Sequence, residues 1–229
     1  MFDGEGAIGG DVRSVLVFGG SFDPPHAGHV RFAARARAAL GLEWLVCVPA
    51  ARSPHKEVGP VASGEDRVAM LGLAFVDVAR VLVSRVEIDR AEAEEASYTV
   101  ETLREIRALL GDGVRMRLLI GADQAASFHR WREARSIIEM AEPAVVLREP
   151  WAALDGLLEA MVPHWDADEL EAWRGRVIDV EPMEVSSTEV RGLLRARGTD
   201  GWGAARSRLV EVVGEEVLWY VEREELYLG

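Results

Sequence analysis

The chain has 229 residues, which is enough for one α/β domain with a sizeable hydrophobic core. Apolar residues make up 49% of it, a fraction typical of globular proteins and too high for a disordered chain. The 26 basic and 39 acidic residues give a net charge of −13. This acidity excludes the basic footprint of a nucleic-acid-binding protein, and it requires local positive groups wherever an anionic substrate binds.

The single cysteine and the lengths of the apolar runs bear on the compartment. Cys47 cannot form an intrachain disulfide, its apolar neighbours predict a buried strand, and a structural zinc site would need more Cys and His ligands. No apolar run reaches the roughly 18 residues of a membrane span, and the N-terminus lacks the pattern of a signal peptide. We therefore expect a soluble cytoplasmic protein without membrane or nucleic-acid partners, with a flexible extension over residues 1–12 and a single domain over 13–229.

Apolar runs that predict β-strands alternate along the chain with segments of helical periodicity. Strands are predicted over residues 15–18, 45–48, 81–86, 116–120, 144–147 and 177–180. Helices are predicted over residues 31–40, 65–76, 100–110 and 136–140, with a last helix over 209–228. The near-continuous apolar strands predict a Rossmann-like, doubly wound parallel α/β sheet with ligands at the carboxyl ends of its strands. Residues 151–176 are expected to form a peripheral helical insertion.

The most informative segment is Gly-Gly-Ser-Phe-Asp-Pro-Pro-His-Ala-Gly-His at residues 19–29, between the first predicted strand and the first predicted helix. Gly19 and Gly20 let the backbone approach a ligand closely, and the free N–H groups of a helix N-terminus bind anions. His26 and His29 are three residues apart, so both project from one face of the helix toward such an anion. Two histidines at this spacing alone would indicate a capped helix N-terminus, and the strand–glycine–helix context adds the interpretation of a phosphate site with two proton-bearing donors.

The same residues match every fixed position of the GG(S/T)FDPxHxGH signature, so the chain resembles the HxGH nucleotidyltransferase superfamily. In that superfamily the two histidines lie against the phosphates of ATP or CTP during nucleotidyl transfer. The resemblance implies that His26 and His29 are catalytic. It also implies an ATP-binding set from this segment, namely Gly19, Gly20, Ser21, Phe22, His26, Gly28 and His29.

A second segment, Ser-Ser-Thr-Glu-Val-Arg, ends at Arg191 and resembles the ISSTxIR motif of the same superfamily. Ser186 and Glu189 have capping-box spacing, which alone predicts a well-capped helix. The resemblance adds that the Ser186 and Thr188 hydroxyls bind the triphosphate, and that Arg191 is a catalytic multi-donor cation. A role for Ser187 stays open.

Ser-Pro-His-Lys at residues 53–56 follows the second predicted strand. Alone, this composition indicates a solvated surface loop more readily than a site. It resembles the PPHK loop of the family, with Ser53 in place of the first proline. The resemblance implies that His55 and a catalytic Lys56 approach the nucleotide phosphates.

Ser97-Tyr98-Thr99 precedes a predicted helix and, with Thr102 and Leu103, resembles the SYTxxTL stretch of bacterial nicotinate-mononucleotide adenylyltransferases. Taken alone, Ser and Thr here indicate only a helix N-cap. The resemblance implies that backbone N–H groups beside Tyr98 and Thr99 receive the pyridine carboxylate. A helix N-terminus is a suitable receptor for such an anion.

Ile-Gly-Ala-Asp at residues 120–123, followed by Trp131, resembles the IGxD…W segment of that family. Alone, Asp123 indicates a helix cap and Trp131 a packing residue. The resemblance implies that Gly121 and Asp123 contact ATP, the aspartate at the sugar, and that Trp131 stacks on the pyridine ring. Arg148 matches an arginine near the mononucleotide phosphate.

Two further expectations concern histidines. His129 and His164 match no motif and are expected at the surface. Replacing His29 is expected to cost little stability, because a site histidine at a helix start is not a core residue.

The resemblances together imply transfer of the adenylyl group of ATP to nicotinate mononucleotide, giving nicotinate adenine dinucleotide and pyrophosphate on the route to NAD. The attacking phosphate is already an anion, so no general base or covalent intermediate is needed. Mg²⁺ is expected with ATP, held by phosphates and water, with no dedicated protein metal site. The alternatives are a related adenylyltransferase for nicotinamide mononucleotide or phosphopantetheine, and a non-catalytic nucleotide-binding regulator. Formation of a homo-oligomer and strictness toward acid over amide substrates stay open.

Overall fold

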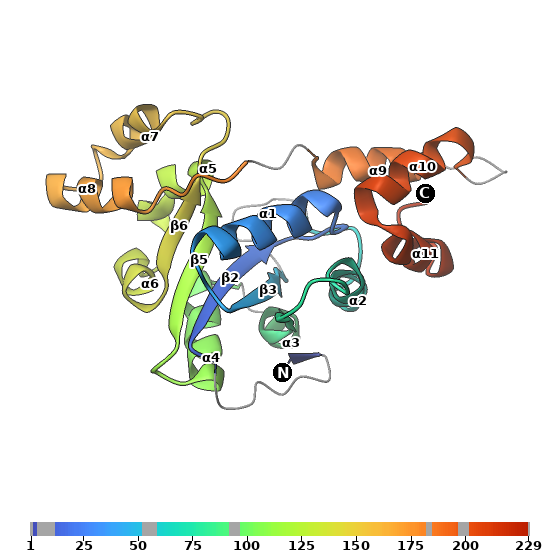
Figure 1. Ribbon diagram of the computed structural model, residues 1–229, viewed down its shortest axis with the longest axis horizontal. Helices are drawn as coiled ribbons and strands as arrows, with labels where there is room; N and C mark the ends of the chain where they lie inside the picture. Colours follow the sequence, from blue (N-terminus) through green and yellow to red (C-terminus); the bar gives the residue numbers. More distant parts are fainter. Residues whose placement is uncertain are drawn as a thin grey trace.

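The computed structural model describes residues 2–3, 12–51, 59–91, 97–181, 185–196 and 202–228. Within them, one sheet has the strand order β1-β4-β3-β2-β5-β6 (Figure 1). Strands β2 to β6 are parallel, and the short β1 pairs antiparallel with β4 at the edge. The bounds are β1 Phe2–Asp3, β2 Ser14–Gly20, β3 Trp44–Pro49, β4 Val81–Ser84, β5 Arg115–Gly121 and β6 Glu142–Val146.

This strand order confirms the predicted doubly wound sheet. The chain moves outward from β2 through β3 to β4, and then returns to the other side of β2 for β5 and β6. The winding direction therefore changes between β2 and β5. In open α/β sheets, ligands bind in the crevice that forms at this point, beyond the carboxyl ends of the strands.

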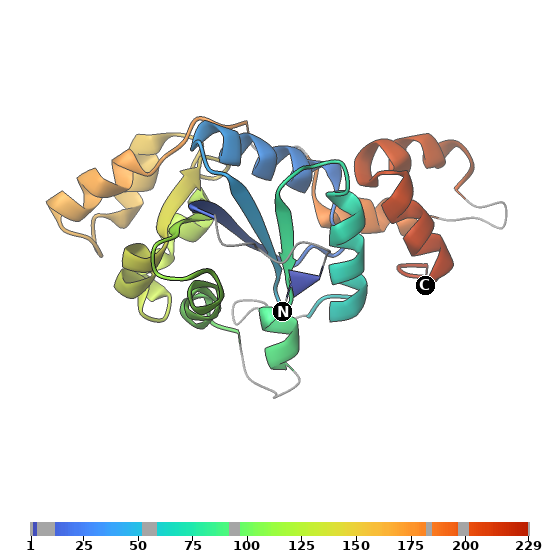
Figure 2. The same cartoon turned by 60° about the horizontal axis from the view of Figure 1, so that its bottom comes forward.

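Helices cover both faces of the sheet, and Figure 2 shows α1 on one side of the strands and α4 with α6 on the other. The helices of this part of the chain are α1 Ala27–Ala39, α2 Gly64–Ala74, α3 Val86–Ala91, α4 Thr99–Leu110, α5 Ala122–Ala126, α6 Ala134–Met140, α7 Leu154–Met161 and α8 Ala167–Gly175.

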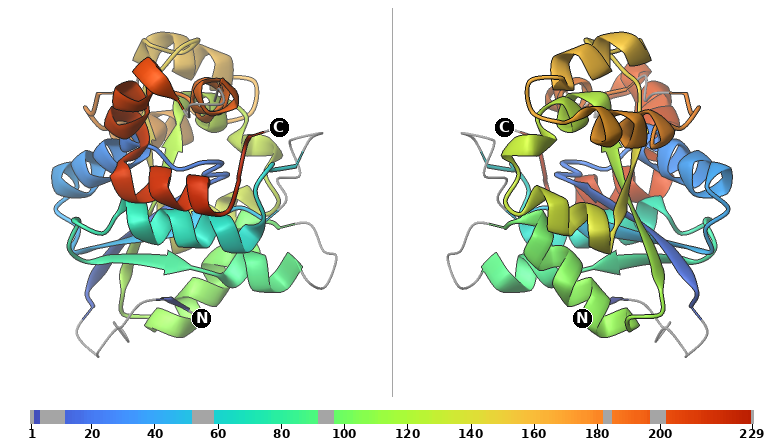
Figure 3. Two further views of the ribbon diagram at one scale, coloured as in Figure 1. Left: turned by 90° about the vertical axis from the view of Figure 1, so that its right-hand side faces the viewer. Right: turned by 90° about the vertical axis from the view of Figure 1, so that its left-hand side faces the viewer.

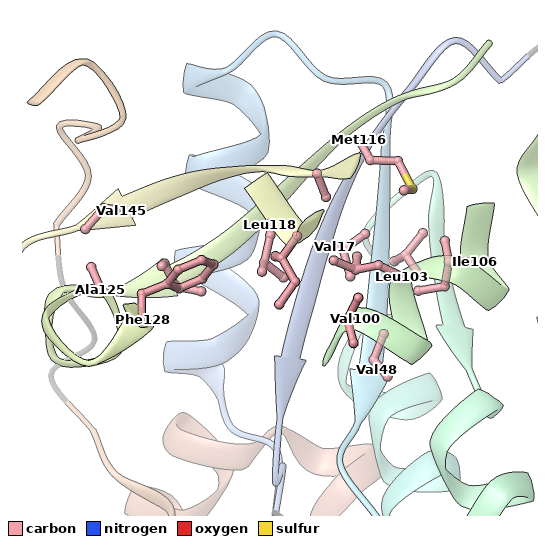
Figure 4. Packing of buried hydrophobic residues seen from close by; sticks show 14 of the residues in the cluster. Val17, Val48, Val100, Leu103, Ile106, Met116, Leu118, Ala125, Phe128 and Val145 are labelled. Carbon is pink, nitrogen blue, oxygen red and sulfur yellow. The ribbon is translucent and has the colours of Figure 1, made fainter. Parts of the chain in front are cut away.

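The strands are buried on both faces, which explains their continuous apolar sequences. Val17 of β2 belongs to the core beneath α4, where Figure 4 shows it near Leu103. The next residue, Phe18, belongs to the opposite core, beneath α1 and α2. Cys47 is fully buried in that second core, as predicted, and burial raises the pKa of its thiol.

Helices α9 Ser187–Arg195, α10 Arg206–Val213 and α11 Glu215–Arg223 form a C-terminal unit that lies beside α2 (Figure 3). Its own core includes Val190, Leu209 and Leu218, together with Met70 of α2. One continuous helix over residues 209–228 was predicted, and this is wrong. Gly214 has a φ of +87°, a left-handed conformation that ends α10 and lets α11 turn back.

Residues 151–176 form α7 and α8 at the far end of the molecule from the C-terminal unit (Figure 1). Two buried tryptophans anchor them. Trp165 and Trp173 have ring centroids 5.4 Å apart, and Trp173 lies edge-on to Phe128 at 5.2 Å. The segment therefore extends the core beneath α4 and α6 rather than lying loosely on the surface.

Two predicted strands differ from the structure. Residues 177–180 form only an isolated bridge between Val177 and Val145 beside β6. The N–H of Ile178 donates to the Val145 carbonyl oxygen, and the chain then leaves the sheet. The strand predicted over residues 81–86 ends at Ser84, and α3 begins at Val86. No helix in the described part of the chain is long and apolar enough to cross a membrane.

Candidate active site

A cavity of about 440 Å³ opens at the carboxyl ends of the central strands. The β2 terminus, at Gly19 and Gly20, forms one wall. The start of α4, at Tyr98 and Thr99, and the indole of Trp131 line the opposite wall. The structure therefore brings together segments that the sequence analysis assigned separately to ATP and to the pyridine nucleotide, at the point where the sheet reverses its winding.

The glycines at the ends of β2 and β5 lie close to neighbouring side chains. A Cβ atom at Gly20 would lie 3.0 Å from the ring of Phe22. At Gly121 it would lie 2.6 Å from Asp123 Oδ1 and 2.7 Å from Arg148 Nε. Both strand ends are thus kept free of side chains where the cavity begins.

His26 and His29 form a reciprocal cap at the N-terminus of α1. His29 N–H donates to His26 Nδ1 at 3.4 Å, and His26 N–H donates to His29 Nδ1 at 3.2 Å. The ring centroids are 3.7 Å apart. The capping interpretation and the phosphate-donor interpretation therefore apply to the same two rings.

The reciprocal cap also fixes which ring nitrogens can donate. Burial lowers the pKa of His26 to about 4. Burial, and then the neighbouring His26, lower the pKa of His29 well below its usual range. Both rings are thus neutral at pH 7, and since each Nδ1 accepts a backbone N–H, each ring proton is on Nε2. The pair offers two neutral N–H donors.

The buried ring of Phe22 packs against the histidine pair. Its ring is buried, lies 5.0 Å from that of His29 and makes an edge contact with Phe18 at 5.3 Å. Its φ of +46° is unusual for a non-glycine residue, and such strain is retained where surrounding contacts enforce it. The structure therefore places the Phe22 side chain in the core beneath the site.

Helix α9 brings its polar residues against the same loop. Ser186 caps the helix by accepting the N–H of Glu189 at 3.2 Å, as the spacing predicted. The Ser187 hydroxyl donates to the carbonyl oxygen of Pro24 at 3.0 Å. Arg191 donates to the carbonyl oxygen of Asp23 at 2.6 Å and to Thr188 Oγ1 at 3.1 Å. The predicted triphosphate residues therefore lie next to the histidine-bearing loop.

The opposite wall of the cavity begins with an uncapped helix. Tyr98 is the N-cap residue of α4, and its side chain makes no capping hydrogen bond. The simple expectation that a Ser or Thr caps this helix is therefore wrong. Trp131 stacks on Phe128 at 4.8 Å, which holds the indole at the cavity. The first turn thus has no side-chain cap, and an uncapped helix N-terminus beside an indole is able to receive a planar anionic group.

Asp123 and Arg148 form an ion pair, with Nε 2.8 Å from Oδ1. The sequence analysis assigned the first to the nucleotide sugar and the second to the mononucleotide phosphate. Both side chains remain 40% exposed, so a ligand can reach each of them and replace the ion pair. His55 and Lys56 lie outside the described residues.

Sequence reasoning missed two buried charged residues that hydrogen-bond to segments next to the site. Arg67 is buried and donates to the carbonyl oxygens of Ser21 at 2.9 Å and Ala50 at 2.6 Å. Glu87 is buried, accepts the Thr102 hydroxyl at 2.8 Å and lines the cavity; burial raises its pKa. The available signal was a charged residue just inside a predicted helix or just beyond a predicted strand, which is too common to identify a role.

His129 and His164 are stacked on each other, with ring centroids 3.5 Å apart. His164 is exposed as expected, but His129 is half-buried, and its burial lowers its pKa. The expectation that both are surface residues therefore holds for only one of them. Neither lines the cavity.

The chain has clear relatives. The sequence model of the Cytidylyltransferase-like family matches residues 17–193. A protein of Chromobacterium violaceum named "Probable nicotinate-nucleotide adenylyltransferase" is 33% identical over 93% of this chain and 98% of its own length. A protein of the same name from Pseudomonas aeruginosa is 34% identical, over 94% and 97%.

A solved structure agrees with the fold. The Plasmodium falciparum nicotinic acid mononucleotide adenylyltransferase complexed with NaAD superposes with a TM-score of 0.67 at 14% identity, covering 94% of this chain and 97% of that one. The family match over most of the chain and the relatives above 30% identity lead to one assignment. The chain belongs to the nicotinate-nucleotide adenylyltransferase family of Cytidylyltransferase-like proteins.

Proposed function

We propose that this protein transfers the adenylyl group of ATP to nicotinate mononucleotide, giving nicotinate adenine dinucleotide and pyrophosphate. One observation carries the proposal. A single cavity joins the glycine end of β2, which leads directly to the two histidines, to the uncapped start of α4 and the indole of Trp131. ATP phosphates fit the first wall and a pyridine carboxylate fits the second.

In this reaction a 5′-phosphate oxygen of the mononucleotide forms a bond to the α-phosphorus of ATP. The bond from that phosphorus to its bridging oxygen breaks, and pyrophosphate leaves. The Nε2–H groups of His26 and His29 donate to oxygens on which charge increases, and Arg191 binds the β- and γ-phosphates. We assign Lys56 to the same phosphates on the motif alone.

The described residues fit Mg²⁺ held by ATP rather than by a protein cage. None of them form a group of three or more His, Cys, Asp and Glu side chains able to hold a metal. The Asp23 carboxylate already accepts the N–H groups of Val61 and Ala62, and Asp123 is paired with Arg148. Bound to ATP, Mg²⁺ supplies charge neutralisation at the phosphates. This chain's residues supply the positioning.

Preference for the acid over the amide follows from the first turn of α4. Its N–H groups and positive dipole end favour a carboxylate. The NH₂ of an amide is itself a hydrogen-bond donor, so it would be placed against these N–H donors and could not pair with them. An unpaired buried polar group costs on the order of 1–3 kcal/mol. We therefore expect kcat/KM for nicotinate mononucleotide to exceed that for nicotinamide mononucleotide by roughly tenfold to a few hundredfold.

The test is pyrophosphate release from ATP with each mononucleotide, and with phosphopantetheine, using the purified protein. Release that is fastest with nicotinate mononucleotide supports the proposal. Equal kcat/KM for acid and amide would overturn the substrate assignment while leaving the nucleotidyltransferase activity intact. No release with any acceptor would favour a nucleotide-binding regulator.

A further inference from the structure

A tyrosine near the end of the described chain is hydrogen-bonded to the loop that carries the catalytic histidines. The Tyr227 hydroxyl donates to Asp23 Oδ1 at 2.7 Å, across 204 positions of sequence. Tyr227 is 6% exposed and Asp23 4% exposed. Burial, and then the hydrogen bond to Asp23, raise the pKa of the phenol, so it remains a donor at neutral pH.

Asp23 connects several elements at once. Its Oδ1 also accepts the N–H of Ala62 at 3.0 Å, and its Oδ2 accepts the N–H of Val61 at 2.8 Å, just before α2. Its carbonyl oxygen accepts Arg191 Nη1, and the same nitrogen lies 3.7 Å from Oδ2. The aspartate therefore fixes the loop between β2 and α1 relative to α2, α9 and the C-terminal end.

We propose that Tyr227 is a positioning residue for adenylyl transfer: its hydroxyl holds the Asp23 carboxylate so that Arg191 stays directed to the phosphates. The inference rests on the proposed function. The Asp23 carboxylate accepts hydrogen bonds from neutral donors, including the Tyr227 hydroxyl, while the Arg191 guanidinium is only at ion-pair distance from it. When the phenol is lost, Oδ1 keeps only the N–H of Ala62, and the less neutralised carboxylate attracts Arg191, whose Nη1 already lies 3.7 Å from Oδ2, and draws it away from ATP.

The Tyr227→Phe substitution removes only the hydroxyl and keeps the buried ring. We expect kcat/KM for ATP to fall about tenfold, the scale of one hydrogen bond to a charged group. KM for nicotinate mononucleotide should stay within about twofold, because Tyr98 and Trp131 line a different part of the cavity, at the start of α4 and beside Phe128.

The chain offers a matched control in Tyr220→Phe. The Tyr220 hydroxyl donates to Asp66 Oδ1 at 3.0 Å, so this variant also loses one tyrosine–aspartate hydrogen bond between the C-terminal unit and the α2 region. Asp66 has no contact with the histidine-bearing loop in the described hydrogen bonds. Both variants should lower the thermal midpoint, and only Tyr227→Phe should lower kcat/KM for ATP.

A double-mutant cycle tests the route through Arg191. If Tyr227 acts by keeping the Asp23 carboxylate from pairing more closely with Arg191, Tyr227→Phe should have a smaller effect in an Arg191→Lys background than in the wild type. Equal ATP kinetics for Tyr227→Phe and Tyr220→Phe, or fully additive effects in the cycle, would overturn the inference. A wild-type protein that does not adenylate nicotinate mononucleotide would instead overturn the proposed function.

Discussion

The two walls of the cavity are built differently. One part of the lining is the end of β2, at Gly19, Gly20 and Ser21, and the loop that follows it has its polar groups bound by the protein itself. There the histidines cap each other, and Asp23, Ser21 and Pro24 accept hydrogen bonds from distant elements. On the α4 side, the helix begins without a side-chain cap. The part that we propose to stabilise transition-state charge is preorganised, whereas the part that we propose to recognise the substrate has no side-chain cap of its own.

Replacing His29 should break the preorganised wall most severely. His29→Ala removes one transition-state donor, so we expect kcat to fall at least about a hundredfold. It also removes half of the reciprocal cap and a ring packed against Phe22. The unfolding free energy should therefore fall by roughly 1–3 kcal/mol, contrary to the small effect expected from the sequence.

Pyrophosphate release and chemical denaturation measure these two losses separately. The exposed His164 provides a control, since His164→Ala should keep normal kcat. Near-normal turnover of a folded His29→Ala protein would remove this residue from the mechanism.

Arg191→Lys should damage the same wall more mildly. Lysine keeps the charge but cannot donate to the Asp23 carbonyl, to Thr188 Oγ1 and to phosphate together. We expect kcat/KM for ATP to fall about tenfold or more, because hydrogen bonds that involve charged groups contribute more free energy than neutral ones. Arg195→Lys, on the exposed side of the same helix, is the control. Unchanged steady-state kinetics for ATP in Arg191→Lys would contradict the assignment.

Trp131→Ala tests the recognition wall. Loss of stacking, worth about 1–3 kcal/mol for a base on an aromatic ring, should raise KM for both mononucleotides about tenfold. Their ratio should stay nearly constant, because stacking does not distinguish a carboxylate from an amide. Trp219→Ala, at an exposed indole, is the matched control. A collapsed ratio would show that the indole, rather than the first turn of α4, selects the acid.

The buried histidines predict a modest pH dependence of stability. The unfolded chain takes up protons near pH 6.5, whereas folded His26 does so only near 4. Stability is therefore fully present above about pH 6.5 and is lost as the pH falls toward 4, by at most about 1.4 kcal/mol per pH unit for each such histidine. His29 contributes with the same sign. Urea midpoints from pH 7 to 5 should show a smaller slope in a His26→Asn variant than in the wild type.

The sequence predicted the central strands and the elements of the cavity because those depend on local patterns. Continuous apolar runs identified β2, β3, β5 and β6, and the strand–glycine–helix order placed His26 at a helix start. The break at Gly214 and the short α3 were missed, since one left-handed glycine or one helical turn hardly changes the hydrophobic period.

The supporting residues were missed for another reason. Asp23 was interpreted only as one position of the signature motif, and Tyr227 only as part of the last predicted helix. Their hydrogen bond joins positions 204 residues apart, and no local pattern encodes such a pairing. The mutual pairing of Asp123 with Arg148 was likewise invisible, because each had been assigned to a ligand.

The hydrogen bonds that join the Asp23 loop to α9 and Tyr227 have a consequence for the order of folding. The central strands β2 and β5 pair across a shorter stretch of sequence, Ser14 with Arg115, than the stretch that separates the histidine-bearing loop from α9 and Tyr227, more than 160 positions away. Contacts of such high sequence separation form late, because loop-closure entropy opposes them until the rest of the chain is compact. In refolding, recovery of catalysis should therefore lag behind burial of the sheet, and the site is the last part of the molecule to mature.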